Sequence, residues 1–484
     1  MKKQANFVVI GSGGAGMAAA VSAMQNGIKD ILVLEKSQFL GGNSRMAGGD
    51  LHVADPIDKD NGNNKADDEF REAMSFHHYR LVNPKILRTF LDESWNTIEF
   101  VRDLGIPYRN GGTMVNNKYP FGNFYAVIKR MAEVLTEGGN EILRNTGATK
   151  ILTDEDGAVC GVEAVNDQGE TITIACKAVA ITTGGFTGNS ELLHEYFPEE
   201  YDDLFYTDAL PLQGDGISLA KSAGAELAAH CTLVKENAYS CDSRLDAPNR
   251  AAHQGCSLWV NAYGERFHDE TSTMGNESAN ALVRQPGMIG YALFDGNIFE
   301  AMQKPGMMGG PPPGMDMGEG GPGGPGGPEG EGMPMRHGPG NPKDSLEAEY
   351  KRKSGWVFKA DSIEELAKAA GIDAEALCAT VKEYNEFCYN QRDGLFAKDP
   401  KFLIPLTKAP FYALKFRPIL IDTQGPIIVN EKMQVLSEKD HKPVPGLYAG
   451  GVCTSGSQGN DYHLRGANLG YSVTSGRIIG MSVV

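Results

Sequence analysis

The sequence lacks the cysteine pairs and the long apolar runs that mark several large classes of protein. Its eight cysteines stand singly, and no two of them form CxxC or CxxCH, so iron–sulfur and c-type haem sites have no signature here. Single cysteines are typical of a reducing cytoplasm, where disulfides are rare. No apolar segment approaches the length of a membrane span, and the run before Gly11 is too short for the core of a signal peptide. The sequence therefore predicts a cytoplasmic protein without a membrane span.

Positive charge is also scarce. The chain has 45 Lys and Arg against 62 Asp and Glu, a formal net charge of −17 at pH 7. This balance argues against nucleic acid or an anionic membrane as a main partner. With 484 residues, of which 41% are hydrophobic, the chain is long enough for two or three domains with sizeable cores.

The most informative feature that is present is the stretch VVIGSGGAGMAAA at residues 8–20. Gly11, Gly13 and Gly16 form GxGxxG directly after an apolar strand, and the next apolar run, ILVLEK, contains Glu35. A strand–turn–helix–strand unit that ends in an acid is typical of the binding of an adenosine dinucleotide. The helix N-terminus stabilises the phosphates, and Glu35 can accept hydrogen bonds from both ribose hydroxyls.

The rest of the chain divides by pattern. Residues 65–145 are predicted to be mainly helical from their apolar spacing. Residues 151–185 alternate as strands around the turns Asp156-Gly157 and Gln168-Gly169. The Pro/Gly/Met-rich stretch at 305–342 is expected to be an extended, mobile surface loop, either a substrate lid or an excursion without function. A helix capped by Asp361 or Ser362 follows, and the last hundred residues return to strands and end in a helix.

Seven segments occur in one order and resemble a known family. They are GSGGAGMAAA, LEKSQFLGGNSRMAGGD, AVAITTGGF, GDGISLAKSAGAEL, LWVNAYGERFHDE, FKADSIEELAKAAGI and VPGLYAGGV. Together they resemble the fumarate reductase/succinate dehydrogenase flavoprotein family, which also includes 3-ketosteroid dehydrogenases and urocanate reductase. The resemblance implies an α/β fold. Its Rossmann-like FAD-binding domain is assembled from both chain ends, 1–223 and 409–484. An α+β capping domain is inserted at 224–408 and contains the 305–342 stretch.

The resemblance also implies where FAD binds. Carried over position by position, the cofactor-binding residues are Gly11, Gly13, Ala15, Gly16, Glu35, Lys36, Gly42, Asn43, Ser44, Gly48, Gly49, Ala148, Thr183, Gly184, Asp215, Gly451, Asn468 and Leu469. Ala148 is expected on the adenine side, Asp215 near the isoalloxazine ring, and Asn468 and Leu469 at the pyrimidine edge of that ring. Covalent members carry a histidine in the segment that matches Gly41 to Gly49. This chain has none there, so FAD is expected to be non-covalent, although His52 lies close by.

The chain departs from the family at the positions that set the chemistry. The family's reaction is hydride transfer from flavin N5 to an activated double bond, with a protein acid protonating the neighbouring carbon. Met274 stands at the position of the arginine acid, and Gln458 at the position of a substrate-binding histidine. Arg465 is one residue off the carboxylate-binding arginine. A dicarboxylate needs several fixed cations, so these departures favour a neutral or weakly charged acceptor, for example an aromatic or polycyclic one.

The candidate catalytic residues are Tyr462, His463, Arg465 and Arg284. The first three each have an ordinary structural interpretation as well: a packed ring, a satisfied buried imidazole, and an ion pair with Asp461. Arg266 and Glu270 are interpreted as a structural pair that holds the capping domain on the FAD domain. The histidine in the 305–342 stretch has no ligand cluster around it, so no metal site is predicted.

The leading hypothesis is thus an FAD-dependent reductase of a small neutral organic acceptor. Tetrahydrodaidzein, which is reduced to equol, is a candidate acceptor, because the size, the missing haem sites and the missing dicarboxylate set resemble tetrahydrodaidzein reductases. The alternatives are a 3-ketosteroid-type dehydrogenase, a fumarate-like enoate reductase and a flavin-binding redox sensor without turnover. No second GxGxxG follows a strand elsewhere. The electron donor therefore stays open between NAD(P)H, free reduced flavin and a partner protein.

Overall fold

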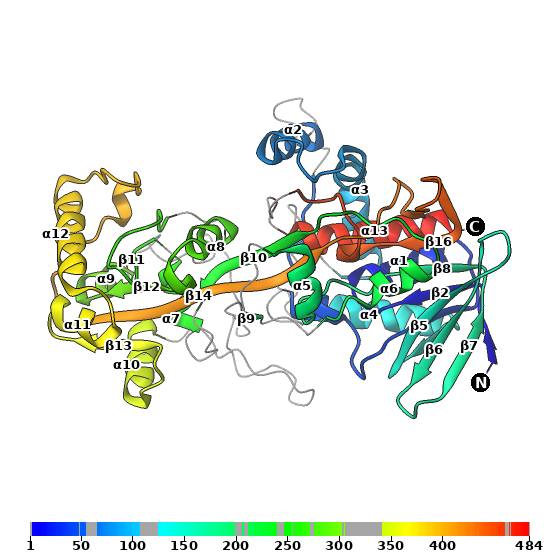
Figure 1. Ribbon diagram of the computed structural model, residues 1–484, viewed down its shortest axis with the longest axis horizontal. Coiled ribbons are helices and arrows are strands. Elements are labelled where there is room, and N and C mark those ends of the chain that lie inside the picture. The colour runs from blue at the N-terminus through cyan, green and yellow to red at the C-terminus, as the bar shows by residue number, and fades with distance from the viewer. Residues whose placement is uncertain are drawn as a thin grey trace. The chain divides into compact units, whose positions relative to one another are not determined.

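The chain folds into two compact units (Figure 1). The computed structural model describes residues 2–47, 49–54, 65–106, 124–198, 206–207, 212–239, 246–253, 255–271, 275–302, 304, 341–459, 464 and 466–483. The first unit comprises Met1–Tyr201, Ala209–Val234 and Ile421–Val484, and the second comprises Asp202–Asp208 and Lys235–Leu420. Two of these boundaries fall at 234/235 and 420/421, compared with 223/224 and 408/409 for the domains expected from the sequence.

The first unit is built on a six-stranded sheet in the order β15-β16-β8-β2-β3-β4. These strands are Gln434–Leu436, Pro443–Ala449, Ala178–Ile181, Phe7–Ile10, Ile31–Leu34 and Glu141–Leu143. All neighbours pair in parallel except β15 and β16. The strands β2, β3 and β8 are buried along their whole length, as expected of a parallel sheet covered on both faces.

A second sheet of the first unit has the order β1-β7-β6-β5. Its strands are Lys2–Gln4, Thr171–Ala175, Val159–Asn166 and Thr146–Thr153. The pairs β5–β6 and β6–β7 are antiparallel, and their turns contain Gly157 and Gly169 at φ of 82° and 77°. The predicted hairpins and their two turns are therefore confirmed, because only glycine adopts these positive φ values without strain.

The helices of the first unit follow the apolar spacing of the sequence. The segment predicted to be helical contains α2 (Lys65–His77), α3 (Pro84–Asp103) and α4 (Tyr125–Glu137). Asn83 caps α3 by accepting hydrogen bonds from the backbone of the first turn. Two short helices, α5 (Ser190–Tyr196) and α6 (Asp215–Ser222), follow β8, and a 3₁₀ turn, η1, spans Gly42–Met46.

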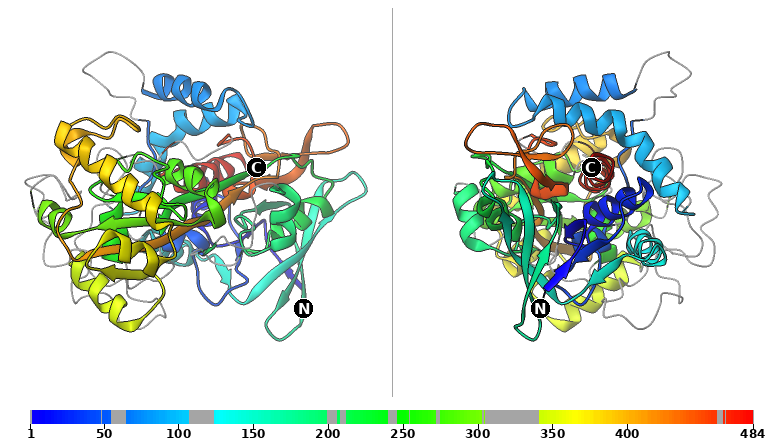
Figure 2. Two further views of the ribbon diagram at one scale, coloured as in Figure 1. Left: turned by 60° about the vertical axis from the view of Figure 1, so that its left-hand side comes forward. Right: turned by 90° about the vertical axis from the view of Figure 1, so that its right-hand side faces the viewer.

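The two ends of the chain meet in one helix pair, α1 (Gly14–Gln25) and α13 (Ala467–Ser482). The views of Figure 2 show the dark-blue α1 beside the red α13. A methyl group on Gly476 would overlap the backbone of Ala15, and one on Gly480 would overlap the backbone of Ala19 and Ala23. Both helices are buried along most of their length. The small residues at their crossing therefore set how closely the first and last helices approach.

The second unit is a mixed sheet with helices. Its strands are β9 (Tyr206–Thr207), β10 (Thr232–Tyr239), β11 (Leu258–Asn261), β12 (Gly290–Phe294), β13 (Val357–Ala360) and β14 (Phe411–Gln424). Three of them, β9, β12 and β13, pair with β14, and β10 is its neighbour in the sheet. The last residues of β14 belong to the first unit.

The helices of the second unit are α7 (Asp246–Ala252), α8 (Gly275–Val283), α9 (Gly296–Met302), α10 (Pro342–Arg352), α11 (Ile363–Ala370) and α12 (Ala374–Asn390). Ser362 is the predicted cap of α11, since its hydroxyl accepts from the Glu365 amide at 3.2 Å. The predicted loop at 305–342 lies outside the described residues except at its end, where Asn341 caps α10.

A buried ion cluster lies in the second unit. Arg266 contacts Glu270 at 2.9 Å and Asp393 at 3.0 Å, and Lys398 lies 3.3 Å from Glu270. Burial raises the pKa of Glu270, but the two cations outweigh it and hold that pKa below its usual value. The predicted pair of Arg266 and Glu270 is confirmed. Its described partners belong to the second unit, which the cluster stabilises. The expectation that the pair holds the capping domain on the FAD domain stays a prediction.

The crossing of α1 and α13 predicts the sign of the stability change when a glycine is replaced by alanine. In an exposed helix, replacing glycine by alanine stabilises by about 1 kcal/mol. At Gly476 we expect Gly476→Ala to lower the free energy of unfolding by about 1–3 kcal/mol instead, because the added methyl overlaps Ala15. Urea denaturation measures the change, with Ser75→Ala on the exposed face of α2 as the control. A variant more stable than the wild type would contradict the close approach.

Candidate cofactor site

The turn after β2 leaves an open space at the N-terminus of α1. Gly11 adopts φ of 104°, and a Cβ there would lie 2.5 Å from the carbonyl oxygen of Thr182. A Cβ on Gly16 would overlap the carbonyl oxygen of Gly11. At Gly13 the nearest atoms would be 3.8 Å away, and the first turn of α1 contains no acidic side chain. Gly11 and Gly16 are therefore needed for close packing, whereas Gly13 faces open space at a helix N-terminus, which suits an anion.

Glu35 follows β3 and is held from both sides. The residue is buried, with 7% of its surface exposed. The backbone N–H and the hydroxyl of Ser12 donate to Oε2 at 3.1 and 2.5 Å, and the N–H of Ser37 donates to Oε1 at 2.8 Å. Gly41 in turn donates its N–H to the Ser12 hydroxyl. The carboxylate is thus fixed beside the glycine turn, where each oxygen can accept a further hydrogen bond.

Lys36 and Asp215 form an ion pair with 2.6 Å between Nζ and Oδ2. Asp215 is the first residue of α6, after Gly214 at φ of 77°. Lys36 also lies against Gly147, whose Cβ would be 3.5 Å from the Lys36 Cβ, and Gly147 precedes Ala148. The structure therefore places Lys36, Asp215 and Ala148 at one end of the site. The expected position of Asp215 beside the isoalloxazine ring gains no support from this contact.

The loop after β3 turns back onto the first helix. Gly41 adopts φ of 108° at the start of η1, which contains Gly42, Asn43 and Ser44. The Ser44 hydroxyl accepts a hydrogen bond from the N–H of Gly14 at 3.0 Å. Gly49 has φ of 92°, and Gly48 lies outside the described residues. This loop is thereby tied to the N-terminus of α1.

Thr183 and Gly184 follow β8, and Thr183 has a buried polar atom next to Gly216 of α6. The Thr183 hydroxyl oxygen is buried and has no hydrogen-bond partner among the described residues. Its neighbour Thr182, by contrast, donates its hydroxyl to the carbonyl oxygen of Ile10 at 2.8 Å. Gly184 adopts φ of 76°. A buried hydroxyl without a partner costs free energy, so Thr183 suits a site where a ligand supplies the missing bond.

The C-terminal part of the chain completes the site. Gly451 has φ of 75°, and its Cβ would lie 3.0 Å from the Cβ of Ala15. Asn468 and Leu469 lie in the first turn of α13, which has no acidic residue. The side-chain amide of Gln424 donates to Asn468 Oδ1, and the hydroxyl of Ser457 donates to Gln424 Oε1 at 3.1 Å. Sequence segments more than 400 residues apart thus line one site in the first unit.

Comparison with known proteins identifies the ligand of such a site. A family model described as an FAD binding domain matches residues 6–469. The chain belongs to this family. It is an FAD-binding oxidoreductase, and the residues present fit the cofactor: an open glycine turn at a helix N-terminus, a fixed acid, and an orphaned hydroxyl.

Individual relatives agree with this assignment. The chain is 28% identical to the vinyl phenol reductase of Lactiplantibacillus plantarum over 497 residues, which cover 98% of this chain and 95% of that protein. It is 27% identical to the NADH:fumarate oxidoreductase of Klebsiella pneumoniae, with 95% of this chain but only 45% of that protein covered. The 3-ketosteroid delta1-dehydrogenase of Sterolibacterium denitrificans has a TM-score of 0.76 at 18% identity, covering 99% of each chain. The predicted fold class is confirmed.

The predicted catalytic residues of this FAD-binding oxidoreductase are mostly beyond the described structure. Tyr462, His463 and Arg465 lie outside the described residues, as does Met274. Arg284 follows α8 in the second unit, and its side chain is exposed. Gln458 is buried, at 2% exposure. Their catalytic roles stay predictions, and the exposure of Arg284 does not support its role.

Sequence reasoning missed several polar residues of the site. Ser12 holds Glu35, and Gln424 holds Asn468. Arg45 is buried in η1, with its guanidinium 4.9 and 5.1 Å from the ring centres of Phe39 and Tyr125. Its Nε has no hydrogen-bond partner among the described residues. The arginine inside a glycine-rich loop was a visible signal for an anion contact, whereas the partner of Gln424 lies 44 residues away.

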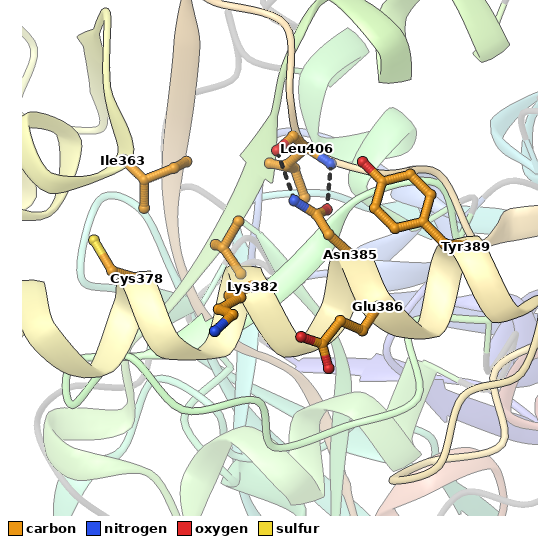
Figure 3. A pocket seen from close by; sticks show the side chains of 8 residues that line it. Ile363, Cys378, Lys382, Asn385, Glu386, Tyr389 and Leu406 are labelled. Carbon is orange, nitrogen blue, oxygen red and sulfur yellow. Dashed lines mark hydrogen bonds between the residues drawn. The ribbon is translucent and has the colours of Figure 1, made fainter.

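A surface cavity of about 460 Å³ lies elsewhere, in the second unit (Figure 3). It is lined by Ile363, Cys378, Val381, Lys382, Asn385, Glu386, Tyr389 and Leu406, and Figure 3 shows most of these side chains rising from α12. None of the predicted site residues belongs to it.

Among the described helices, none is both long and apolar enough to cross a membrane.

Two adjacent threonines give a matched test of the site. We expect Thr182→Val to destabilise the flavin-free protein by about 1 kcal/mol, because it loses the bond to Ile10. Thr183→Val removes a hydroxyl without a partner and should leave that stability unchanged or raised. In the same variant, loss of a bond to FAD should raise the Kd for FAD about fivefold. Thermal unfolding of the flavin-free protein measures the change in stability, and fluorescence titration with FAD measures the Kd. Equal destabilisation by both variants would contradict the assignment.

Proposed function

We propose that this oxidoreductase is a reductase that transfers a hydride from flavin N5 to the activated double bond of a neutral, aromatic or polycyclic acceptor. When bound, FAD supplies the hydride, and a proton is added to the neighbouring carbon. Of the relatives reported above, one is named a vinyl phenol reductase and one an NADH:fumarate oxidoreductase. A vinyl phenol is a neutral aromatic compound, whereas fumarate is a dicarboxylate.

One observation supports the neutral acceptor. At the predicted flavin edge, the described side chains that form the polar network are amides and a hydroxyl: Gln424, Asn468 and Ser457. Gln458, the nearby buried residue, is also neutral. A dicarboxylate is recognised by fixed cations, above all by bidentate arginine. A site lined by neutral donors and acceptors instead favours an acceptor with hydroxyl or carbonyl groups.

The chain's residues would hold FAD along the site as follows. We propose that the N-terminus of α1, with Gly13 and Ser44, binds the pyrophosphate, and that Glu35 binds the adenosine ribose. Asp215 is better placed on the adenosine side with Lys36, because the two form an ion pair. Asn468 and Leu469, in the first turn of α13, would stabilise negative charge on the reduced ring by the helix N-terminus.

A panel of acceptors tests the substrate class. Enzyme reduced chemically under anaerobic conditions is mixed with a vinyl phenol, tetrahydrodaidzein, cinnamate, urocanate, an enone steroid or fumarate, and flavin reoxidation is followed by absorbance. Chemical reduction makes the test independent of the physiological electron donor. The identity of that donor stays open, and so does the cytoplasmic location. We expect a neutral aromatic or polycyclic compound to reoxidise the flavin at least about 100-fold faster than fumarate, because about 3 kcal/mol of charge recognition is missing.

The controls separate the alternatives. Buffer alone gives the background rate, and reoxidation by no acceptor of the panel would indicate a flavin-binding sensor. Fumarate reacting faster than the neutral compounds would overturn the proposed acceptor class. Oxidation of a saturated ketosteroid with a dye acceptor, without reduction of the enone, would indicate a dehydrogenase instead.

We also propose that FAD is bound without a covalent link. His52 is the histidine closest in sequence to the Gly41–Gly49 segment, and its Nε2 lies 2.9 Å from Glu69 Oε2. Its ring also lies 6.0 Å from that of Phe90. A nitrogen occupied by a carboxylate is not free to bond to the flavin.

Acid precipitation tests whether FAD is covalently linked to the protein. We expect all yellow flavin to remain in the supernatant and no flavin fluorescence to remain on the protein band of a denaturing gel. The variant His52→Ala serves as the matched control, since it cannot carry flavin at that position. Fluorescence on the wild-type band that disappears in His52→Ala would show a covalent link.

A further inference from the structure

Asp422 is a buried carboxyl at the end of β14, in the part of that strand that belongs to the first unit. Only 7% of the residue is exposed. Its Oδ1 accepts from the N–H of Thr423 at 2.9 Å, and the side-chain amide of Asn43 also interacts with the carboxyl. A Cβ on Gly185 would lie 2.5 Å from Oδ1. The carboxyl is therefore enclosed by the loop after β3 and the loop after β8.

These neighbours are the segments predicted to hold FAD. Asn43 belongs to the flavin loop, and Gly185 follows Gly184 of the second glycine contact. Gln424 lies two residues after Asp422 on the same strand. Its side-chain amide donates to Asn468, which is predicted to lie at the pyrimidine edge of the flavin. Asp422 therefore lies against two segments that the family resemblance assigns to the cofactor, and two residues from the contact between β14 and the third.

The groups that face Asp422 are neutral. The loop after β8 contributes backbone atoms. The N–H of Phe186 in this loop donates to the hydroxyl of Thr423 in β14 at 2.9 Å. From η1 comes the amide of Asn43, while the nearby cation of that turn, Arg45, lies over the rings of Phe39 and Tyr125. Asn468 of α13 and Ser457 of the loop before it, both neutral, contact Gln424, two residues further along β14. Within the described residues, no cation contributes to the ionisation of Asp422.

Burial without a cation favours the protonated acid. Desolvation raises the pKa of Asp422 to about 7, although the Thr423 N–H and Asn43 act in the opposite direction. A general acid works best when its pKa lies near the working pH. By comparison, the Tyr471 hydroxyl is shared with Thr454, and burial raises its pKa far above neutrality.

We propose that Asp422 is the proton donor of the reductive reaction, an inference that rests on the proposed function. The hydride from reduced FAD brings two electrons and one hydrogen to one carbon of the double bond. The O–H bond of the Asp422 carboxyl breaks, and its proton forms a C–H bond at the neighbouring carbon. The π bond is consumed, oxidised FAD and a saturated product result, and water reprotonates the carboxylate. Met274, at the family's acid position, has no proton to give.

The first test compares Asp422→Asn, Asp422→Glu and wild type, all loaded with FAD and chemically reduced. The control is Asp440→Asn, an exposed carboxylate of the same unit that pairs with Lys442. With the best acceptor of the panel, we expect Asp422→Asn to react at least about 100-fold more slowly. The wild-type rate should fall as the pH rises through about 7, and this dependence should disappear in Asp422→Asn. Asp422→Glu should keep a pH-dependent rate, and Asp440→Asn should match the wild type.

A second test needs no acceptor. The folded pKa of Asp422 is raised, so the stability that the neutral carboxyl provides is complete in acid and is lost as the pH rises through about 7. Asparagine cannot ionise. Asp422→Asn should therefore gain stability relative to the wild type between acid pH and pH 8, as measured by urea midpoints of the FAD-bound protein. The infrared band of a protonated carboxyl should titrate near pH 7 in the wild type and be missing in this variant.

The outcomes are distinguishable. If the reduced wild type reacts with no acceptor, the proposed function and the donor role both fail. If the wild type reacts and Asp422→Asn reacts equally fast with the same pH profile, the donor role alone is overturned. Loss of rate in Asp422→Glu as complete as in Asp422→Asn would indicate a structural role and would also overturn it. A stability difference that does not change with pH would show that folding does not raise the pKa of Asp422, which again overturns the proposal.

Discussion

The close approach of the first and last helices is the constraint on which the rest of the structure depends. Gly476 and Gly480 allow α13 to lie directly on the backbone of α1, and Gly451 allows the preceding turn to reach Ala15. Because α1 begins at the glycine turn and α13 begins at Ala467, next to Asn468, one crossing positions both ends of the proposed cofactor site. A larger side chain at the crossing would shift the flavin edge relative to the phosphate turn, even without touching either.

The second physical feature is the separation of charge along the site. The proposed adenosine end carries charged groups, with Glu35 held by Ser12 and Lys36 paired with Asp215. The opposite end has neutral amides and hydroxyls around Asp422. An extended dinucleotide needs both environments: polar recognition for its ribose and phosphates, and a dry, neutral surrounding for its ring. A buried ion cluster around Arg266 lies in the second unit and stabilises that unit.

Much of the fold was predictable because it is encoded locally. The glycine turn, the hairpin turns at Gly157 and Gly169, and the cap at Ser362 each depend on residues a few positions apart. The site was predictable only where a motif is continuous. Asp422 was included in a predicted strand, but its burial depends on Gly185 and Asn43, which are far away in the sequence. The pairing of Asp215 with Lys36 spans 179 residues, so no local pattern could reveal it.

The neutral acceptor and the protonated Asp422 support each other physically. The pKa of this carboxyl is set by burial, and no described cation offsets it. An anionic acceptor bound nearby would add a like charge to a site without a counterion, and the cost of placing two negative charges in a low dielectric is several kcal/mol. A neutral acceptor avoids this cost, and its hydroxyl or carbonyl group can pair with the amides of Gln424 and Asn468. The same lack of cations that disfavours fumarate is what keeps an acid available in the site near neutral pH.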